Sequence, residues 1–340
     1  MDWNKKRLQT LCLLLGLLLL FGCAAKPALE TSPATPPEAS VVSPAQEITA
    51  QETQAPDAAK GIRFTDMGGN EIVRSAPATR IVALTPADVE ILYAIGAGDT
   101  IIGCGEYCDY PAEAASIPVM QTGVELNMEQ LLAAAPVVLL LNPQMLSTSA
   151  AVSTQAQVER LSAAGVQIVI SNALDIAGVY EAIEMLGVLT GNTDGAEAVV
   201  TGMREAFASV SAIDAARGKS VYFEISPLEY GLWTAGTHTF MDEIAGMLGL
   251  TNCFADVTDY GEISEEQVLA RNPDYIVTIS MYFGEGPTPA EEIASRPGWQ
   301  NVSAVQNGAI LNLRNNELSR PGPRLAEGAK LLGDLLRGEG

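Results

Sequence analysis

The sequence predicts an α/β protein of two lobes, each built on a parallel β-sheet, with one long helix joining them. Short apolar strands alternate with helices between residues 80 and 171, and the same alternation resumes between residues 220 and 336. Such alternation is typical of a parallel sheet covered by helices on both faces. The stretch between these regions has a helical pattern without a strand, so we expect it to connect two separate sheets.

The first lobe is predicted to span residues 61–175. It begins with a hairpin, because two short strand-like segments flank the turn-rich sequence Asp66-Met67-Gly68-Gly69-Asn70. Further strands are expected at residues 80–84, 100–103, 137–141 and 166–171, and helices at residues 87–96, 128–135 and 151–164. The strands are short apolar runs, which is the pattern of strands buried on both faces.

A helical connector is predicted over residues 176–216, and the second lobe over residues 217–340. The connector holds two helical segments, 175–190 and 194–213, separated by Gly191-Asn192. The second segment would be roughly 30 Å long, so we expect it to be the rigid link between the lobes. In the second lobe, strands are expected at residues 220–226, 275–280 and 309–313, and helices at residues 239–248, 265–270 and 325–336.

The N-terminal segment has the pattern of an export signal. Lys5, Lys6 and Arg7 precede an unbroken apolar run, Leu11–Phe21, which is too short to span a bilayer as a helix. The run leads into Leu20-Phe21-Gly22-Cys23, which resembles a bacterial lipobox. We therefore predict that residues 1–22 are a lipoprotein signal peptide and that Cys23 is lipidated. An ordinary secretory signal is the alternative.

Residues 23–60 are predicted to be a tether that begins at the lipidated cysteine. The segment 24–60 contains six prolines, no aromatic residue and no glycine. Such a composition cannot bury enough apolar surface to fold. Stable anchoring requires two or more lipids on Cys23, and the lobes would then be held just outside a cell membrane.

One helix–strand pattern occurs in both lobes. The sequences Asn127-Met128-Glu129-Gln130-Leu131-Leu132-Ala133 and Ser264-Glu265-Glu266-Gln267-Val268-Leu269-Ala270 each precede a proline and a buried strand, 137 residues apart. Each begins with a good N-cap residue and carries Gln at the third helical position, as in a capping box. Glu129 and Glu266 therefore occupy the second position of two matching helices. They either complement the helix dipole or present one acidic group per lobe to a partner.

Charge and motif content exclude several classes of function. The chain has 41 acidic and 19 basic residues and a formal net charge of −22, so it would repel a nucleic acid. Its one histidine cannot supply a multi-histidine metal site. Neither a Gly-x-Ser-x-Gly elbow nor a GxxxxGK[ST] phosphate loop occurs. We therefore predict no catalytic residue, cofactor or resident metal, the alternative being a carboxylate enzyme that uses Glu106 and Asp109.

Motifs in both lobes form a larger pattern. They are Arg80-Ile81-Val82-Ala83-Leu84-Thr85-Pro86, Glu90–Gly98, Glu106-Tyr107-Cys108-Asp109-Tyr110-Pro111, Asn127-Met128-Glu129, Ser264–Val268, Pro297–Gly308 and Arg320-Pro321-Gly322-Pro323-Arg324. Together they resemble the iron-siderophore and cobalamin binding proteins that serve ATP-binding-cassette (ABC) importers, over residues 62–338. The resemblance implies two Rossmann-like lobes joined by a single long helix, with little hinge closure. We expect a monomer.

The resemblance also implies partners. In this family a glutamate on each lobe docks into arginines of the permease, and the matching positions here are Glu129 and Glu266. Arg–carboxylate contacts of this kind are charge-assisted and often bidentate. We therefore expect the chain to deliver its ligand to an ABC permease and its ATPase through these two residues.

Aromatic residues are frequent in the loops where a ligand is expected. Ligands of open α/β sheets bind beyond the carboxyl ends of the strands. The aromatic residues of such loops are Tyr107, Tyr110, Tyr230, Trp233, Tyr260, Tyr282 and Phe283. They offer large, rigid contact area for a flat, bulky ligand. We predict Tyr107, Trp233 and Tyr260 as ligand contacts, local packing for Tyr110 and a structural role for Arg324.

Charges around the predicted site help to choose among ligands. The resemblance places polar ligand contacts at Asn316 and Arg320. Anionic catecholate and carboxylate siderophores need two or three Arg or Lys, whereas the first-lobe loop offers Glu106 and Asp109, and the basic candidates are Arg314 and Arg320. A neutral or cationic ligand suits the chain better. We predict cobalamin or another corrinoid, with a ferric siderophore or haem as the alternative.

Histidine and cysteine leave two further alternatives. Haem would need an axial ligand such as a tyrosine or His238, but His238 follows Gly236-Thr237 and precedes Thr239, as expected of a loop or cap residue. Cys104 and Cys108 are four residues apart, and a disulfide between them would require an oxidising compartment and a geometry that spacing does not reveal. We expect free or structural cysteines.

Overall fold

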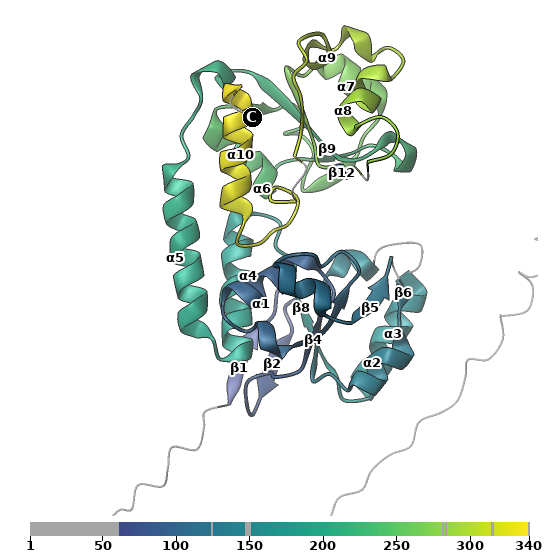
Figure 1. Ribbon diagram of the computed structural model, residues 1–340, viewed down its shortest axis with the longest axis vertical. Helices are drawn as coiled ribbons and strands as arrows, with labels where there is room; N and C mark the ends of the chain where they lie inside the picture. Colours follow the sequence, from purple (N-terminus) through teal and green to yellow (C-terminus); the bar gives the residue numbers. More distant parts are fainter. Residues whose placement is uncertain are drawn as a thin grey trace, which may run out of the picture. The chain divides into compact units, whose positions relative to one another are not determined.

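The computed structural model describes most of the predicted lobes (Figure 1). The described residues are 61–123, 125–146, 151–280, 282, 284–313 and 316–338. The predicted signal peptide 1–22, the tether 23–60 with Cys23, and also Phe283 and Arg314, lie outside them. The described residues all belong to one compact unit. Within the described part, no helix has the length and apolar character needed to cross a bilayer.

The first lobe is built on a six-stranded sheet with the order β6-β5-β4-β3-β7-β8. Its strands are β3 (Ile81–Ala83), β4 (Ile101–Gly105), β5 (Val119–Thr122), β6 (Glu125–Leu126), β7 (Val138–Leu141) and β8 (Gln167–Ile170). Five strands are parallel, and β6 runs antiparallel to β5. A hairpin of β1 (Ile62–Thr65) and β2 (Glu71–Arg74) precedes the sheet. The predicted hairpin and strands are therefore confirmed, and the β5–β6 edge was missed.

Helices cover both faces of this sheet. They are α1 (Pro86–Ala94), α2 (Met128–Ala134), α3 (Ala151–Ala163) and α4 (Ile176–Thr190). Successive residues of a strand point to opposite faces. Ile81 and Val138 therefore join the apolar cluster of α1 and α4, whereas Val82 and Leu139 join that of α2 and α3. This two-sided burial explains why the strands are continuous apolar runs rather than alternating ones.

The second lobe has the predicted parallel strands at the centre of its sheet and an antiparallel edge that was not predicted. Its strands are β9 (Ser220–Ser226), β10 (Trp233–Ala235), β11 (Thr251–Asn252), β12 (Tyr260–Glu262), β13 (Tyr275–Thr278) and β14 (Ile310–Asn312). β9, β13 and β14 are parallel, and β11 is parallel to β9, but β10 is antiparallel to both β9 and β12. β10 and β12 were missed because Thr234, Gly261 and Glu262 interrupt the short apolar run by which a buried strand is found.

Helices also cover both faces of the second sheet. α6 (Phe240–Leu248) and α10 (Leu325–Arg337) pack on one face, against Phe223 and Val277. The other face holds Tyr222 and Ile276 against α7 (Glu265–Arg271), α8 (Pro289–Ser295) and α9 (Ser303–Gln306) with the neighbouring Trp299. α8 and α9 were not predicted.

The long connector is α5 (Thr193–Ser209), which follows α4 after a left-handed Gly191. Its 17 residues give a length of about 25 Å. It lies alongside α4 and α10 (Figure 1). The prediction of a helix over 194–213 was wrong at its C-terminal end, because Val210 is already extended, with φ −71° and ψ 128°. The predicted link between the lobes is nevertheless present.

The lobes are joined by more than this helix. A single apolar cluster includes Ile81 of the first sheet and Phe223 of the second. The Phe240 amide donates to the Leu174 carbonyl at 2.8 Å, and Glu243 of α6 accepts from the first amide of α4, that of Ile176, also at 2.8 Å. Rotation of one lobe against the other would break these contacts, so the fold disfavours a large hinge closure.

Candidate functional site

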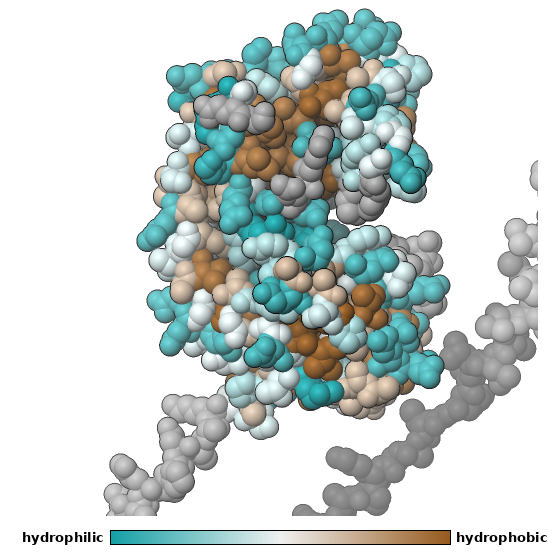
Figure 2. Space-filling model, viewed as in Figure 1, coloured by the Kyte–Doolittle hydropathy of each residue, from teal (hydrophilic) through white to brown (hydrophobic). Residues whose placement is uncertain are grey.

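A cavity of about 760 Å³, here called the central pocket, lies between the two lobes. Asn142 and Asn172, which line it, follow β7 and β8 of the first lobe, and Ile225 and Ile279 line it at the ends of β9 and β13. Figure 2 shows the surface hollowed between the lobes on the side away from α5. The pocket thus occupies the place where open α/β sheets bind ligands. Another hollow, of about 520 Å³, lies between α5 and α10, away from these strand ends.

The second lobe provides an apolar and aromatic wall. Trp233 opens β10 and Tyr260 opens β12, and the antiparallel pairing of these strands brings both side chains to the central pocket. Phe240 and Met241, at the start of α6, line it as well. Burial raises the pKa of Tyr260, so its phenol stays neutral at physiological pH. The structure therefore brings two predicted contact residues together and adds Phe240 and Met241 to the lining, both of which sequence reasoning missed.

Tyr107 and Asn316 lie beside Arg320 rather than in the lining of the central pocket. Tyr107 is 52% exposed. Its backbone carbonyl accepts a hydrogen bond from Arg320 Nη2 at 3.1 Å. Asn316 has a φ of 63°, and its carbonyl accepts from the amides of Ser319 and Arg320 at 3.1 and 3.2 Å. The backbones of both residues position Arg320, and their assignment as ligand contacts stays a prediction.

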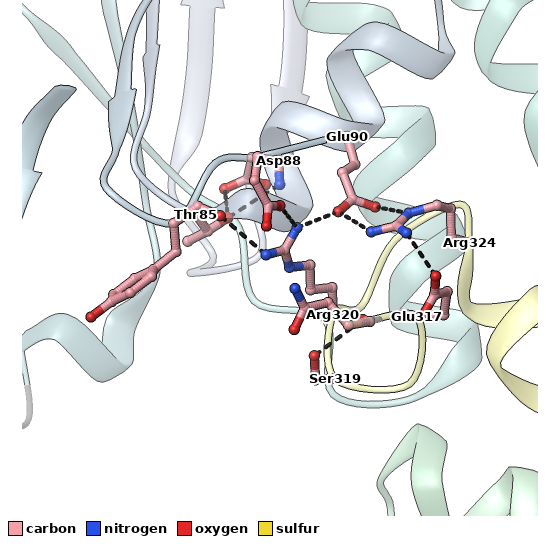
Figure 3. A network of polar contacts seen from close by, with 10 residues as sticks. Thr85, Asp88, Glu90, Glu317, Ser319, Arg320 and Arg324 are labelled. Carbon is pink, nitrogen blue, oxygen red and sulfur yellow. Dashed lines mark hydrogen bonds and ion pairs between the residues drawn. The ribbon is translucent and has the colours of Figure 1, made fainter. Parts of the chain in front are cut away.

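Arg320 itself belongs to an ion-pair network between the two lobes (Figure 3). Glu90 of α1, whose side chain is 2% exposed, accepts from Arg320 Nη1 at 2.9 Å and from Arg324 Nε and Nη2 at 2.9 and 2.8 Å. Arg320 also contacts Asp109 at 2.6 Å, and Arg324 contacts Glu317 at 3.1 Å. The positive charge of Arg320 is therefore already balanced within the protein.

Arg324 has the structural surroundings expected of it. Its guanidinium lies 3.9 Å from the ring centroid of Tyr110, and Glu90 raises the pKa of the guanidinium. Sequence reasoning missed Glu90. The signal was its position inside an apolar helix pattern, where a buried carboxylate requires a partner.

A smaller cavity of about 240 Å³, here called the side pocket, adjoins the central pocket and shares Asn142 and Ser319 with it. Asp88, which is 1% exposed, lines it. The hydroxyls of Ser171 and Thr85 donate to Asp88 at 2.6 and 2.7 Å. Burial nevertheless raises the pKa of Asp88 to about 6, because the two hydroxyls offset only part of the desolvation.

Replacing Asp88 by Asn should stabilise the protein at neutral pH. An Asp with a pKa raised from 3.8 to about 6 binds its proton more tightly in the folded protein than in the unfolded chain. The free energy of unfolding therefore falls as the pH rises between these two pKa values. The whole decrease corresponds to about 3 kcal/mol. We expect Asp88→Asn to gain about 1–3 kcal/mol at about pH 8 and little at about pH 4 in urea unfolding. A difference from wild type that does not change with pH would contradict this.

The two predicted docking residues lie on matching helices. Glu129 is the second residue of α2 and Glu266 the second of α7, and both are exposed. Both helices have seven residues and end at a left-handed residue, with a φ of 46° in α2 and 45° in α7. The Ser264 side chain lowers the pKa of Glu266, which keeps that carboxylate ionised. The internal repeat is therefore a structural repeat, and its role in docking stays a prediction.

The remaining histidine and cysteines occupy ordinary surroundings. The His238 side chain is 73% exposed and lies 3.9 Å from Asp259. Its φ of 65° is that of a turn. Cys104, Cys108 and Cys253 are free thiols, so the alternative of a Cys104–Cys108 disulfide is not formed here. Among the residues that the structure describes, no group of three His, Cys, Asp or Glu side chains could hold a metal ion.

Comparisons with known proteins agree with this architecture. The family model described as periplasmic binding protein matches residues 81–317. The chain is 27% identical over 280 residues to YvrC of Bacillus subtilis, an uncharacterized ABC transporter substrate-binding lipoprotein, covering 81% of this chain and 85% of that one. It is 26% identical to the vitamin B12-binding protein of Salmonella paratyphi A, covering 76% and 90%.

A solved structure shows the same fold. It is described as a possible iron-binding, periplasmic solute-binding protein from Staphylococcus epidermidis, with a TM-score of 0.63 and 29% identity, covering 76% of this chain and 98% of that one. The family match extends from the first strand of the first sheet to the network around Arg320. The chain therefore belongs to the periplasmic binding protein family, as an extracytoplasmic, non-enzymatic solute-binding component of an ABC importer of the iron and cobalamin type.

Proposed function

We propose that the protein captures cobalamin or another corrinoid in the central pocket and delivers it to its permease. In this proposal Cys23 carries the lipid anchor, residues 24–60 are the tether, and the protein works as a monomer. Glu129 and Glu266 dock on the permease, one from each lobe.

The choice of a corrinoid as ligand rests on the few basic side chains in the lining of the two pockets. Among the described residues that line the central and side pockets, Arg320 has the one basic side chain. It is already paired with Glu90 and Asp109. An anionic catecholate siderophore would therefore meet no uncommitted cation among these residues, whereas a neutral corrinoid needs none.

The lining of the central pocket supports the same ligand class. Trp233, Phe240, Tyr260, Ile225 and Ile279 offer apolar surface from the second lobe, which suits the flat body of a macrocycle. Asn142, Gln144 and Asn172 offer hydrogen-bonding groups from the first lobe, which suit its amide side arms. The named vitamin B12-binding relative favours this proposal, and the possible iron-binding neighbour favours a ferric siderophore as the second candidate.

Calorimetric titration of the full chain in detergent with cyanocobalamin, a ferric hydroxamate siderophore and haem tests the proposal. We expect cyanocobalamin to bind at micromolar concentration or tighter and the other two to bind weakly. Trp233→Ala and Tyr260→Ala should each weaken binding about 10- to 100-fold, because each removes roughly 1.5–3 kcal/mol of apolar contact. Tyr230→Ala is the matched control, since Tyr230 is exposed and does not line the central pocket. Binding of the ferric siderophore or haem alone would overturn the choice of a corrinoid.

A further inference from the structure

The side pocket is a built polar cavity that opens from the apolar central pocket. Thr85 and Asp88 of the α1 N-terminus, Ser171 after β8 and Asn142 after β7 all line it. It therefore collects groups from three separate first-lobe segments. Asn142, Ala173, Ser319 and Pro321 line both cavities, so a ligand in the central pocket can extend an arm into the side pocket.

Hydrogen-bonding groups in the side pocket are incompletely used. An ionised carboxylate offers about four acceptor sites, and the Asp88 carboxylate accepts hydrogen bonds from the hydroxyls of Ser171 and Thr85. The Asn142 side-chain nitrogen makes one long contact, 3.5 Å to Asn172 Oδ1, while Asn142 Oδ1 accepts from the Gln144 amide at 2.9 Å. Spare acceptor capacity at Asp88 therefore lies in the same cavity as a weakly engaged donor at Asn142.

The surrounding charge is negative. Asp88 and Arg320 line the side pocket, and Arg320 leads into the network of Glu90, Asp109, Glu317 and Arg324. Among these described residues, four negative and two positive charges leave an excess of two negative charges. One Glu317 oxygen, Oε2, is buried without a hydrogen-bond partner, and the two arginines are committed to the network. A second anion would be repelled in this low-dielectric place.

We propose that the side pocket receives an uncharged hydrogen-bonding arm of the ligand, a primary carboxamide in a corrinoid, and excludes an anionic arm. The amide nitrogen donates to Asp88, and the amide oxygen accepts from Asn142. This assignment rests on the proposed function and adds to it, because it makes Asp88 a determinant of ligand charge. Ligands with carboxylate arms are discriminated against even where their apolar body fits the central pocket.

Derivatives of cyanocobalamin in which one propionamide is hydrolysed to a carboxylate test this assignment. We expect at least one of the three monocarboxylic acids to bind the wild-type full chain at least tenfold more weakly than cyanocobalamin at about pH 8. Asp88→Asn, which keeps the shape and removes the charge, should restore that acid to within about threefold of cyanocobalamin. Glu113→Gln is the control, because it removes one exposed negative charge outside both pockets and should restore nothing.

Two results would overturn the assignment. One is equal affinity of the wild type for cyanocobalamin and all three acids. The other is a penalty for the acid that persists unchanged in Asp88→Asn. Urea unfolding of Asp88→Asn, for which we expect a higher stability than for the wild type, tests independently whether this variant is folded.

Failure of the corrinoid proposal is a separate outcome with its own test. If cyanocobalamin does not bind, the same comparison is made with a ferric hydroxamate whose terminal amine is acetylated, hence neutral, or succinylated, hence anionic. Tenfold preference for the neutral form, removed by Asp88→Asn, would support the side-pocket assignment with a different ligand. Equal binding of the two forms, or preferred binding of haem with its two carboxylates, would overturn it.

Discussion

The double variant Glu129→Ala/Glu266→Ala is expected to lose ligand uptake and to keep wild-type ligand affinity. Both carboxylates are exposed at the second position of matching helices. Neither lines the central or the side pocket. Truncating one partner of a buried interfacial ion pair costs about 2–5 kcal/mol, so two such losses would lower permease affinity at least 100-fold. Uptake of radiolabelled ligand by cells and calorimetric binding to the purified chain measure the two effects separately.

A matched control separates docking from charge. Glu159→Ala/Glu197→Ala removes two exposed helical carboxylates, on α3 and α5, and should leave uptake unchanged. Each single docking variant should give an intermediate loss, because one lobe remains engaged. Normal uptake by the double docking variant would remove Glu129 and Glu266 from the interface. Loss of uptake together with loss of ligand binding would place the defect in the fold instead.

Much of the fold could be predicted because burial on both faces makes strands apolar throughout. β7 and β13 are such strands, and each follows a capped helix in the internal repeat. The apolar run of the strand and the N-cap residue of the helix therefore predict the same structure. β10 and β12 have three residues each and carry polar or glycine positions, and they were missed. They create the antiparallel edge that brings Trp233 and Tyr260 together, so the sequence could suggest both residues but not their proximity.

The polar part of the site depends on contacts between distant segments. Arg320 was predicted to face the ligand, and it does line the side pocket, but Glu90 and Asp109 compensate its charge. Glu90 lies 230 residues earlier in the chain, and no local pattern links the two. Likewise, Asp88 accepts a hydrogen bond from Ser171, although 83 residues separate them in the chain. Pairings of this kind follow from tertiary packing, so sequence periodicity cannot reveal them.

Glu90→Ala is expected to cause the largest loss of stability among single variants of the network. Glu90 is 2% exposed and accepts hydrogen bonds from both Arg320 and Arg324, so its removal leaves two largely buried guanidinium groups undercompensated. Breaking a buried pair in this way costs about 3–5 kcal/mol. That loss corresponds to a decrease of roughly 10 °C in the unfolding midpoint of a domain of this size. Urea unfolding followed by circular dichroism measures the loss in free energy of unfolding.

Comparison with Arg320→Met tests why Glu90 matters. That variant leaves Glu90 with both hydrogen bonds from Arg324, so no buried carboxylate is left unpaired and the loss should be about 1–2 kcal/mol. Glu113→Ala, at an exposed position, should change stability by less than about 0.5 kcal/mol. Because the network joins α1 of the first lobe to the segment before α10, Glu90→Ala should also increase hydrogen exchange at that segment. Equal losses for Glu90→Ala and Arg320→Met would mean that packing, not compensation of two cations by one buried carboxylate, holds the segment in place.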